Sequence, residues 1–502
     1  MRPAPRLRLS EPDRTLLALV GRAVVANPFG EERERLDAAL AGERRGSPEE
    51  TLEAGLARVA ARIRDLERDR PLDPSRLETR DRPLARRALL FDIFYRFGGD
   101  FEALIARQLA AGAEPLPVPF APDALGLLAA RGFAAAEAAR IFALLYQLRR
   151  AYRFIARGLI GRSACMRRLR ESLWNNVFTR DLELYDRHLA LRMEDFSTLL
   201  LGETGTGKGA AAAAIGRSGF IPFEERKGRF AVGFPGAFVA LNLAQFPESL
   251  IESELFGHRK GAFTGAVEAH EGVLARCSPH GAIFLDEIGE VSAPVQVKLL
   301  RVLQERAFSP VGSHEPRRFH GRVIAATNRP IEELRGRRLL RDDLFYRLSS
   351  DVITVPTLRR RLEEDPRELG DLLAHAVERL TDAPAPELCR LVERAVARDL
   401  GPRYGWPGNV RELEQCVRRV LLTGGYGGDA RGGGAAAPDR LERLVAGLGA
   451  GALDARGLLA GYCALLHDRH GTYEEVSRRT GLDRRTVRKH VAAARRGTGP
   501  AT

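Results

Sequence analysis

The stretch Thr198-Leu-Leu-Leu-Gly-Glu-Thr-Gly-Thr-Gly-Lys208 carries the strongest structural signal in this 502-residue chain. A short apolar run leads into a glycine-rich loop and an alanine-rich segment, which predicts a strand, a phosphate-binding loop and a helix. The backbone N–H groups of such a loop surround phosphates, and Lys208 can reach the β and γ oxygens. A glycine-rich turn without a ligand is the alternative, and the strand and helix on either side argue against it. The candidate nucleotide-binding residues of this loop are Gly202, Glu203, Thr204, Gly205, Thr206, Gly207, Lys208 and Gly209.

Short apolar runs separated by helical stretches continue on both sides of this loop. Bounded apolar runs that alternate with helices predict buried parallel strands, and therefore an α/β doubly wound sheet over residues 159–356. Ligands of such sheets gather outside the carboxyl ends of the strands. The runs are 198–201, 238–241, 282–285, 323–326 and 352–355, and the polar residues at or near their ends are Gly202, Asn242, Asp286 and Asn328.

Asp286 and Glu287 form an acidic pair directly after one of these runs. An adjacent carboxylate pair after a strand is usually a solvated turn. Together with a phosphate-binding loop, however, it suits a site in which Asp286 holds Mg²⁺ and Glu287 polarises the attacking water. Arg341 and Arg347 are candidates to stabilise charge on the transferred phosphoryl group from a neighbouring subunit, and structural salt bridges are the alternative for both.

A second glycine-flanked loop, Gly261-Ala-Phe-Thr-Gly-Ala266, follows a helix-compatible segment. Its glycines permit a turn with Phe263 at the tip. By shape alone, a large apolar side chain in a short loop more often folds back into its own domain than protrudes.

The segments outside the α/β region are helical or flexible by composition. Residues 1–158 show helical patterns throughout, with Ser10 and Ser47-Pro-Glu-Glu50 as helix starts and a further pattern over about 84–112. Residues 357–423 form a small helical domain, and the glycine-rich 424–453 predicts a linker. No strand and helix alternation typical of a receiver domain occurs in residues 1–158, so their signal stays open, and a docking or oligomerisation module is the simplest interpretation.

Residues 472–494, within the C-terminal segment 454–502, predict a helix-turn-helix. Thr472 and Glu475 fit a capping box, Thr480-Gly-Leu482 fits the turn, and Asp483 can cap the second helix. Cationic residues crowded on a second helix can reach phosphates and base edges, although a basic solvated helix is the alternative. The candidate DNA-binding residues are Arg484, Arg485, Thr486, Arg488, Lys489 and His490.

Composition sets looser limits. A net charge of +13 and a pI near 10.0 suggest a polyanionic partner, although general arginine bias would give the same sum. The five scattered cysteines include no Cys-x-x-Cys pair, which disfavours a metal site or disulfide framework. No uncharged apolar stretch is long enough for a membrane span, so we expect a cytoplasmic protein with no membrane partner.

Taken together, residues 160–423 closely resemble the bacterial enhancer-binding proteins, AAA+ ATPases that activate RNA polymerase carrying sigma-54, and the C-terminal unit resembles their Fis-type domain more loosely. The resemblance implies an AAA+ P-loop NTPase core with a helical lid, an all-α N-terminal domain and a helix-turn-helix domain. It implies ATP and Mg²⁺ as cofactors, and as partners sigma-54 RNA polymerase holoenzyme, enhancer-like DNA and a homo-oligomeric ring, a hexamer. Carried over by position, Gly261 to Ala266 (Gly261, Ala262, Phe263, Thr264, Gly265 and Ala266) contact sigma-54.

The same resemblance assigns roles around the nucleotide. It makes Lys208 the phosphate-loop lysine, Asp286 the metal carboxylate and Glu287 the base. Asn242 would restrain that glutamate, and Thr327 with Asn328 would sense the γ-phosphate. Further residues are the trans-acting pair Arg341 and Arg347, and Arg411 of the lid, where Asn409 can cap the following helix and Glu412 can close the box.

Departures from the family leave alternatives open. Gly209 stands where a Ser, Thr or acidic residue is expected, so a DNA-binding regulator that binds nucleotide without useful turnover is a rival interpretation. An AAA+ remodeller acting on another partner is a further one, disfavoured by the intact contact loop. Residues 220–236 are longer, more basic and more aromatic than the family spacing, which suggests a surface insertion.

Overall fold

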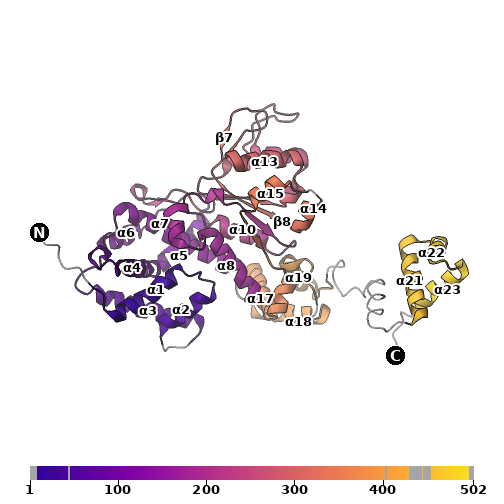
Figure 1. The fold of residues 1–502 in the computed structure, drawn as a ribbon, viewed down its shortest axis with the longest axis horizontal. Coiled ribbons are helices and arrows are strands. Elements are labelled where there is room, and N and C mark those ends of the chain that lie inside the picture. Colours follow the sequence, from indigo (N-terminus) through magenta and orange to yellow (C-terminus); the bar gives the residue numbers. More distant parts are fainter. Residues whose placement is uncertain are drawn as a thin grey trace. The chain divides into compact units, whose positions relative to one another are not determined.

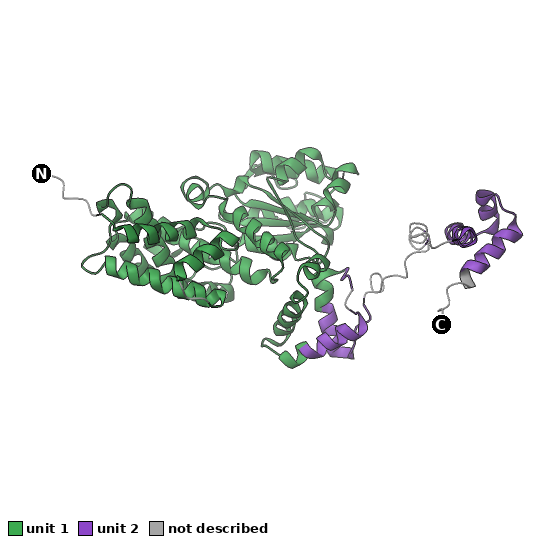
Figure 2. Ribbon diagram, turned by 60° about the horizontal axis from the view of Figure 1, so that its bottom comes forward, with its two compact units in different colours: residues 1–389, 408–414 green, residues 390–407, 415–502 purple. Residues whose placement is uncertain are grey.

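The computed structural model describes residues 8–42, 46–337, 339–401, 404–428, 444 and 454–496. The chain divides into two compact units (Figure 2). The first consists of residues 1–389 and 408–414, and the second of residues 390–407 and 415–502. The first unit therefore contains the phosphate-binding loop, the N-terminal helices and the beginning of helix α19.

A five-stranded parallel sheet lies at the centre of the first unit, with strand order β4-β5-β8-β1-β9. The register pairs Leu201 of β1 with Thr327 of β8, and Asn242 of β4 with Asp286 of β5. The prediction of a parallel α/β sheet is confirmed, because every predicted apolar run forms one of these strands. The strands are β1 (Thr198–Leu201), β4 (Phe238–Asn242), β5 (Ala282–Asp286), β8 (Arg322–Thr327) and β9 (Asp351–Thr354).

The two faces of the sheet belong to two different hydrophobic cores. Since successive side chains of a strand point to opposite faces, Ala282 and Phe284 of β5 pack into one core, and Ile283 and Leu285 pack into the other. The second core contains side chains of α11 (Glu248–Phe256), α12 (Val273–Arg276), α13 (Ala293–Glu305), α14 (Ile331–Gly336) and α15 (Asp342–Leu348). The first core runs from the sheet through α10 (Lys208–Gly216) into the N-terminal helices (Figure 1).

The N-terminal region is helical, as its sequence predicts. Ser10 caps α1, and Ser47 with Glu50 forms the predicted capping box of α3. The pattern over 84–112 forms two helices instead of one, because α4 ends at Arg96 and α5 begins at Gly98. The helices are α1 (Glu11–Val25), α2 (Glu31–Ala41), α3 (Pro48–Leu66), α4 (Arg82–Arg96), α5 (Gly98–Ala111), α6 (Ala121–Ala130) and α7 (Ala135–Gly158), followed by α8 (Ala164–Phe178).

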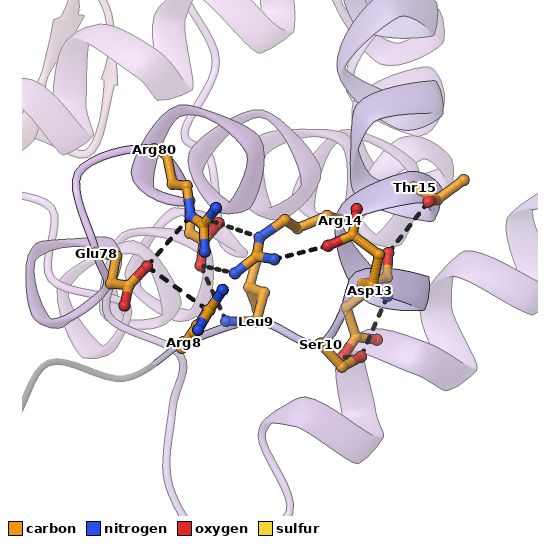
Figure 3. Close-up of polar contacts among 10 residues, drawn as sticks. Arg8, Leu9, Ser10, Asp13, Arg14, Thr15, Glu78 and Arg80 are labelled. Atoms are coloured by element: carbon orange, nitrogen blue, oxygen red, sulfur yellow. Dashed lines mark hydrogen bonds and ion pairs between the residues drawn. The ribbon is translucent and has the colours of Figure 1, made fainter.

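The start of α1 is tied to the start of α4 by one buried carboxylate, Asp81, whose partners Leu9 and Arg14 are labelled in Figure 3. Asp81 accepts hydrogen bonds from the Leu9 backbone N–H at 3.0 Å and from Arg14 Nε at 2.7 Å. The guanidinium of Arg14 lowers the pKa of Asp81. The carboxylate is therefore held in its charged, hydrogen-bonded form, and it fixes the first described residues of the chain against the N-terminal helices.

The insertion at residues 220–236 is not a surface feature, so this part of the prediction is wrong. It contains a small hairpin of β2 (Phe223–Glu224) and β3 (Arg229–Phe230) whose phenylalanines are buried. The Phe230 ring stacks on Tyr146 of α7 at 4.1 Å between centroids, and Phe142 of α7 meets Phe223 edge-on at 4.9 Å. The sequence gives the aromatic residues, but their partners lie in the N-terminal helices, far away along the chain.

The remaining helices follow the sheet. Small helical segments α9 (Leu182–Leu184) and η2 (Tyr185–Leu189) precede β1, and α16 (Leu358–Glu364) and α17 (Glu368–Thr381) follow β9. Then come α18 (Pro386–Asp399) and α19 (Asn409–Thr423), and near the C-terminus α21 (Ala455–His470), α22 (Tyr473–Thr480) and α23 (Arg484–Arg496). The predicted 424–453 linker lies mostly outside the described residues, and the domain boundaries proposed from the sequence remain predictions.

Three observations apply to the described part of the chain. None of its helices is long and apolar enough to span a bilayer. Cys165, Cys277 and Cys463 are free thiols. Among the same residues, no group of three or more His, Cys, Asp or Glu side chains is arranged to hold a metal ion.

Candidate functional site

The phosphate-binding loop connects β1 to α10, as predicted. Gly207 precedes the helix with φ 103°, and Gly205 has φ 80°, conformations that strain residues with a side chain. No atom lies within 4 Å of a Cβ built on Gly207 or Gly209. The loop thus leaves open space beside the first backbone N–H groups of α10, the groups that a helix N-terminus offers to phosphate.

Lys208 is the buried cation of this loop. Its side chain extends back along the loop, where Nζ donates to the carbonyl oxygens of Gly202 at 2.7 Å and Glu203 at 3.2 Å. Burial lowers the pKa of Lys208, while the carboxylates of Glu287 and Asp286 raise it. The structure therefore brings the predicted phosphate-binding lysine and the predicted acidic pair into one electrostatic site.

Glu287 sits in a constrained turn after β5. Its backbone is left-handed, with φ 57° and ψ 50°, a conformation that costs a non-glycine residue about 1 kcal/mol or more. Burial raises the pKa of Glu287, and Lys208 partly offsets this effect. The backbone N–H of Asn328, after β8, donates to Glu287 Oε2 at 3.3 Å, and the Asn328 side chain donates to Thr204 Oγ1 at 3.3 Å. Asn328 thus joins the acidic pair to the phosphate-binding loop.

The beginning of α19 closes over the same loop. The carbonyl of Gly205 accepts a hydrogen bond from Val410 N at 3.0 Å, and a Cβ on Gly205 would lie 2.2 Å from the Gly408 carbonyl oxygen. Arg411 is close enough to lower the pKa of Lys208 by its charge, after the larger effect of burial. The predicted lid arginine therefore lies at the phosphate-binding loop.

Asn409 does not cap α19, contrary to the prediction. Its side-chain Nδ2 donates to Glu203 Oε2 at 3.1 Å and to the Thr204 carbonyl at 3.0 Å, and its Oδ1 accepts from Leu358 N at 2.8 Å. Asn409 is 1% exposed and in effect clamps the phosphate-binding loop. Glu412 still closes back on the helix start, because it accepts from Gly408 N at 2.8 Å.

Asn242 stands beside Asp286 on the neighbouring strand, but its hydrogen bond is local. Its Oδ1 accepts from Ala244 N at 3.0 Å, where it caps a short 3-10 turn. Among the described residues, the structure contains no hydrogen bond between Asn242 and Glu287. The restraint that the resemblance implies is therefore absent in this conformation.

Arg341 and Arg347 lie on the surface around α15. Arg341 Nη2 pairs with Asp343 at 2.8 Å, and its backbone N–H donates to Gln296 Oε1 at 2.9 Å. Both arginine side chains are exposed. Their position is compatible with a role toward a neighbouring subunit, which a single chain does not test.

The glycine-flanked loop leaves the sheet region after α11. Gly261 N donates to the Ala266 carbonyl at 2.8 Å, which closes the loop, and Gly261 and Gly265 have φ values of 79° and 99°. Phe263 is 39% exposed, and its ring meets His258 edge-on at 4.9 Å. Phe263 therefore neither folds back completely into its own domain nor protrudes completely, which are the two arrangements considered from the sequence. Its ring is partly exposed and partly supported by its own loop.

Comparison with known proteins shows which family has a similar phosphate-binding loop, acidic pair and glycine-flanked loop. Residues 179–354 match the family described as "Sigma-54 interaction domain". This part of the chain is therefore similar to the sigma-54 interaction domain of that family. The matched residues include the phosphate-binding loop, the acidic pair, the glycine-flanked loop and α15, and they form the parallel sheet with its helices.

Curated relatives agree with this family. The chain is 42% identical over 237 residues to a Nif-specific regulatory protein of Bradyrhizobium diazoefficiens, covering 47% of this chain and 37% of the relative. It is 38% identical over 262 residues to the DNA-binding transcriptional regulator NtrC of Rhizobium meliloti, covering 52% and 47%. With the C4-dicarboxylate transport transcriptional regulatory protein DctD of Rhizobium meliloti it shares 37% identity over 336 residues, 65% of each chain. The chain thus spans between about a third and two thirds of the length of these relatives.

A solved structure is also similar at low identity. NtrX from Brucella abortus in complex with ADP aligns with a TM-score of 0.41 and 20% identity, over 75% of this chain and 80% of that chain.

The sigma-54 interaction domain contains a supporting hairpin that the sequence analysis missed. It consists of β6 (Ala307–Phe308), β7 (Arg317–Arg318) and the turn between them. Val311 N donates to the Gly257 carbonyl at 2.8 Å, and Arg259 N donates to the Val311 carbonyl at 3.1 Å. Gly312, with φ 75°, packs so closely that a Cβ there would lie 2.8 Å from Ala262 Cβ. The hairpin therefore holds the base of the glycine-flanked loop, and only Gly312 hints at this in the sequence.

Helices α21, α22 and α23 share a small buried core. It includes Cys463, Val476 and Val487, so the two helices of the predicted helix-turn-helix pack against each other. Asp483 caps α23, because its Oδ1 accepts from Arg485 N and Thr486 N at 3.0 Å each. Thr472 makes no side-chain cap, and Glu475 instead binds Arg478 and Arg479, so the predicted capping box is wrong.

The predicted DNA-binding residues divide by exposure. Arg484, Arg485, Arg488 and Lys489 are exposed, whereas Thr486 and His490 are half-buried, and the Thr486 hydroxyl donates to Asp483. Arg484 also pairs with Glu474 of α22 at 2.7 Å. The side chains free to meet phosphates by exposure are Arg484, Arg485, Arg488 and Lys489.

The nucleotide site fits ATP and Mg²⁺ by the chemistry of its donors. A desolvated lysine, a helix N-terminus and open space beside Gly207 and Gly209 suit polyphosphate. Proteins usually hold Mg²⁺ through one or two carboxylates with substrate phosphates and water, so Asp286 suffices as a protein ligand. Gly209 offers no hydroxyl, so metal binding here depends on fewer protein oxygens than in the general motif.

Proposed function

We propose that this chain hydrolyses ATP in an oligomeric ring, a hexamer, and uses the reaction to remodel RNA polymerase carrying sigma-54 at promoters. The observation that carries the proposal is the meeting of Lys208, Asp286 and Glu287 at the loop before α10. The family adds the target, since these residues lie in a sigma-54 interaction domain. The relatives named as regulators of transcription support the same direction.

Each residue has a task in hydrolysis. ATP with Mg²⁺ would supply the phosphoryl bond that breaks and the cation that neutralises its oxygens. Lys208 and the N–H groups of α10 hold the phosphates, and Asp286 holds the metal. Glu287 orients the attacking water and accepts its proton, and burial raises the pKa of this carboxyl, which makes it a stronger base than an exposed glutamate.

The loop from Gly261 to Ala266 contacts sigma-54 through Phe263 and Thr264 at its tip. Asn328 links Glu287 to Thr204, so it is placed to respond when the phosphates at this loop change. Exposed Arg341 and Arg347 would act on the nucleotide of the neighbouring subunit in the ring. The exposed cations of α23 would bind an enhancer-like DNA site.

Phosphate release by the full chain tests hydrolysis. Glu287→Gln should lower turnover by about 10²-fold or more while leaving nucleotide binding intact, because general base catalysis contributes roughly that much. Glu363→Gln, an exposed carboxylate on α16, is the matched control and should leave turnover unchanged. Unchanged turnover in Glu287→Gln would remove Glu287 from the mechanism.

The target requires a second assay, open-complex formation by sigma-54 RNA polymerase with ATP. Thr264→Ala should abolish it while phosphate release continues, and Val267→Ala, exposed just beyond the loop, should not. Normal activation by Thr264→Ala would show that the loop assignment is wrong. Phosphate release without any effect on sigma-54 polymerase would favour a remodeller of another partner.

Gly209 favours one alternative, a DNA-binding regulator that binds nucleotide without turnover. It places no side-chain oxygen beside the metal position. Nucleotide binding by the wild-type chain without phosphate release above that of Glu287→Gln would establish this alternative.

A further inference from the structure

A cavity of about 220 Å³ lies inside the N-terminal region, away from the nucleotide site. Its walls come from α1, α2, α3, α4, α7, α8, α9 and η2, so residues distant in sequence enclose it. Tyr152 is 41% exposed, so one wall reaches solvent. The proposed ATPase mechanism uses none of the residues that line this cavity.

Most of the lining is apolar or aromatic, including Phe91, Phe94, Trp174, Leu90 and Leu145. An apolar cavity of about 150 Å³ is large enough to bind benzene. The present cavity is larger, so it accommodates a single ring or a branched aliphatic body that carries a short polar group.

Arg149 gives the cavity its unpaired charge. Within the described ranges it forms no ion pair, its Nη2 donates to the Phe94 carbonyl at 3.2 Å, and its buried Nε has no hydrogen-bond partner. The guanidinium lies over the Phe94 ring at 4.2 Å. Burial lowers the pKa of Arg149, which reflects the cost of keeping this cation desolvated.

Two of the other charged lining groups are paired, Arg33 with Asp37 at 2.8 Å and Arg86 with Glu137 at 2.6 Å. Asp186 lies 3.1 Å from Arg140, but its buried Oδ1 has no hydrogen-bond partner. Arg149 is thus the lining cation without an ion-pair partner in the described ranges, and a carboxylate matches the fork of a guanidinium.

We propose that this cavity binds a small organic carboxylate with an aromatic or branched aliphatic body, whose carboxylate pairs with Arg149. The body packs among the aromatic side chains of α4 and α8. The carboxylate supplies a counter-charge to the Arg149 guanidinium. A neutral or cationic molecule of the same shape gains the packing but leaves the guanidinium without a counter-charge.

The cavity also lies on the helix that holds the ATPase core. On α7, Leu145, Leu148 and Arg149 face the cavity. The neighbouring Gln147 and Arg150 instead donate to backbone carbonyls just beyond α10. A bound carboxylate would therefore contact the same helix that grips the end of the phosphate-loop helix.

Binding can be measured with full-length protein by the fluorescence of Trp174, since the chain has only two tryptophans and this one lines the cavity. The probes are benzoate, phenylacetate and cyclohexanecarboxylate, each compared with its neutral amide and with benzylamine. We expect a saturable change with at least one carboxylate, and an affinity at least tenfold weaker for its amide. Trp174→Phe should lose the signal. A panel in which no carboxylate saturates, or in which the amides and benzylamine bind equally well, would overturn the proposal.

Two variants test whether Arg149 supplies the positive charge that binds the carboxylate. Arg149→Met keeps much of the apolar stem and should weaken carboxylate binding at least tenfold, with little change for the amide. Arg157→Met, exposed on the same helix, is the matched control and should bind as wild type. Undiminished carboxylate binding in a folded Arg149→Met protein overturns the assignment. Should that variant fail to fold by circular dichroism, the preference of the wild type for carboxylate over amide still decides.

Discussion

The two ends of α10 are held by different parts of the chain. At the N-terminal end, a contiguous stretch of sequence forms the phosphate-binding loop, and Lys208 bonds to the carbonyls of Gly202 and Glu203 within it. Just beyond the C-terminal end, the carbonyls of residues 217–219 accept hydrogen bonds from Arg150 and Gln147 of α7. One end is built locally for chemistry, and the other is held by the N-terminal region.

This difference links the N-terminal helices to the predicted nucleotide site through α10. α10 is a short helix, and its N-terminal amides belong to the nucleotide site. Arg150 is fully buried, its pKa is lowered to about 10 by burial, and it compensates with two hydrogen bonds of 2.7 Å to backbone carbonyls. The Phe230 ring stacked on Tyr146 secures the same junction.

Removing the cation at the N-terminal end should have the largest effect. Lys208→Met should lower phosphate release by about 10²- to 10³-fold, because a preorganised charge at the developing anion is lost. The fold should survive, since the substitution is nearly equal in volume. Lys227→Met, a surface lysine paired with Glu224, is the control and should keep full turnover. Phosphate release within threefold of wild type in Lys208→Met would contradict the site.

Removing the cation at the other end should act on stability. Arg150→Met leaves the carbonyls of Arg217 and Gly219 buried without these donors, so the free energy of unfolding should fall by about 2–4 kcal/mol. Urea unfolding followed by circular dichroism measures this, with exposed Arg157→Met as the control. A change below about 0.5 kcal/mol would show that α7 does not hold α10 in this way.

The same contrast explains what the sequence could predict. The strands, the phosphate-binding loop and the Asp483 cap were predictable because apolar runs, glycines and caps act over a few neighbouring residues. Phe223 and Phe230 were visible as aromatic residues, but not as buried ones, since their partners Phe142 and Tyr146 lie on another helix. Local pattern alone placed them on the surface.

The candidate site shows the same limit. Asn409 has the composition and spacing of a helix cap, yet its amide is used by Glu203 and Thr204 because folding brings the lid onto the loop. Thr472 also has a capping pattern, but Glu475 pairs with two arginines instead. In both places a tertiary or charged partner competes successfully with a local hydrogen bond.

Replacing Gln147, beyond the C-terminal end of α10, should lower the free energy of unfolding less than replacing Arg150. Gln147 Nε2 donates to Tyr185 Oη at 2.7 Å and to the Ser218 carbonyl at 2.8 Å, while its own Oε1 is buried without a partner. Gln147→Leu loses two hydrogen bonds but also removes that unsatisfied oxygen, so unfolding should become easier by only about 1 kcal/mol. Urea unfolding beside Arg150→Met tests the order, and a larger loss in Gln147→Leu would reverse the roles of the two residues.

The smallest effect should appear at the N-terminal end of α10, where Glu287 makes the stability of the fold depend on pH. Burial raises the pKa of Glu287 above its usual value of 4.5. The folded state then binds its proton more tightly than the unfolded state, so ionised Glu287 destabilises the fold above that pKa. Glu287→Gln removes this cost and keeps an oxygen for Asn328 N, so at pH 7 it should stabilise the protein by less than about 1 kcal/mol.

The sign of this difference identifies its cause. Below the unfolded pKa, near pH 4, both states of the wild type are protonated and the advantage of Glu287→Gln should vanish. Exposed Glu363→Gln is the control and should show no such pH dependence. A Glu287→Gln protein that is less stable than wild type at pH 7 would mean that the attraction of Lys208 outweighs burial. Glu287 would then contribute to holding the N-terminal end of α10 together as well as to its chemistry.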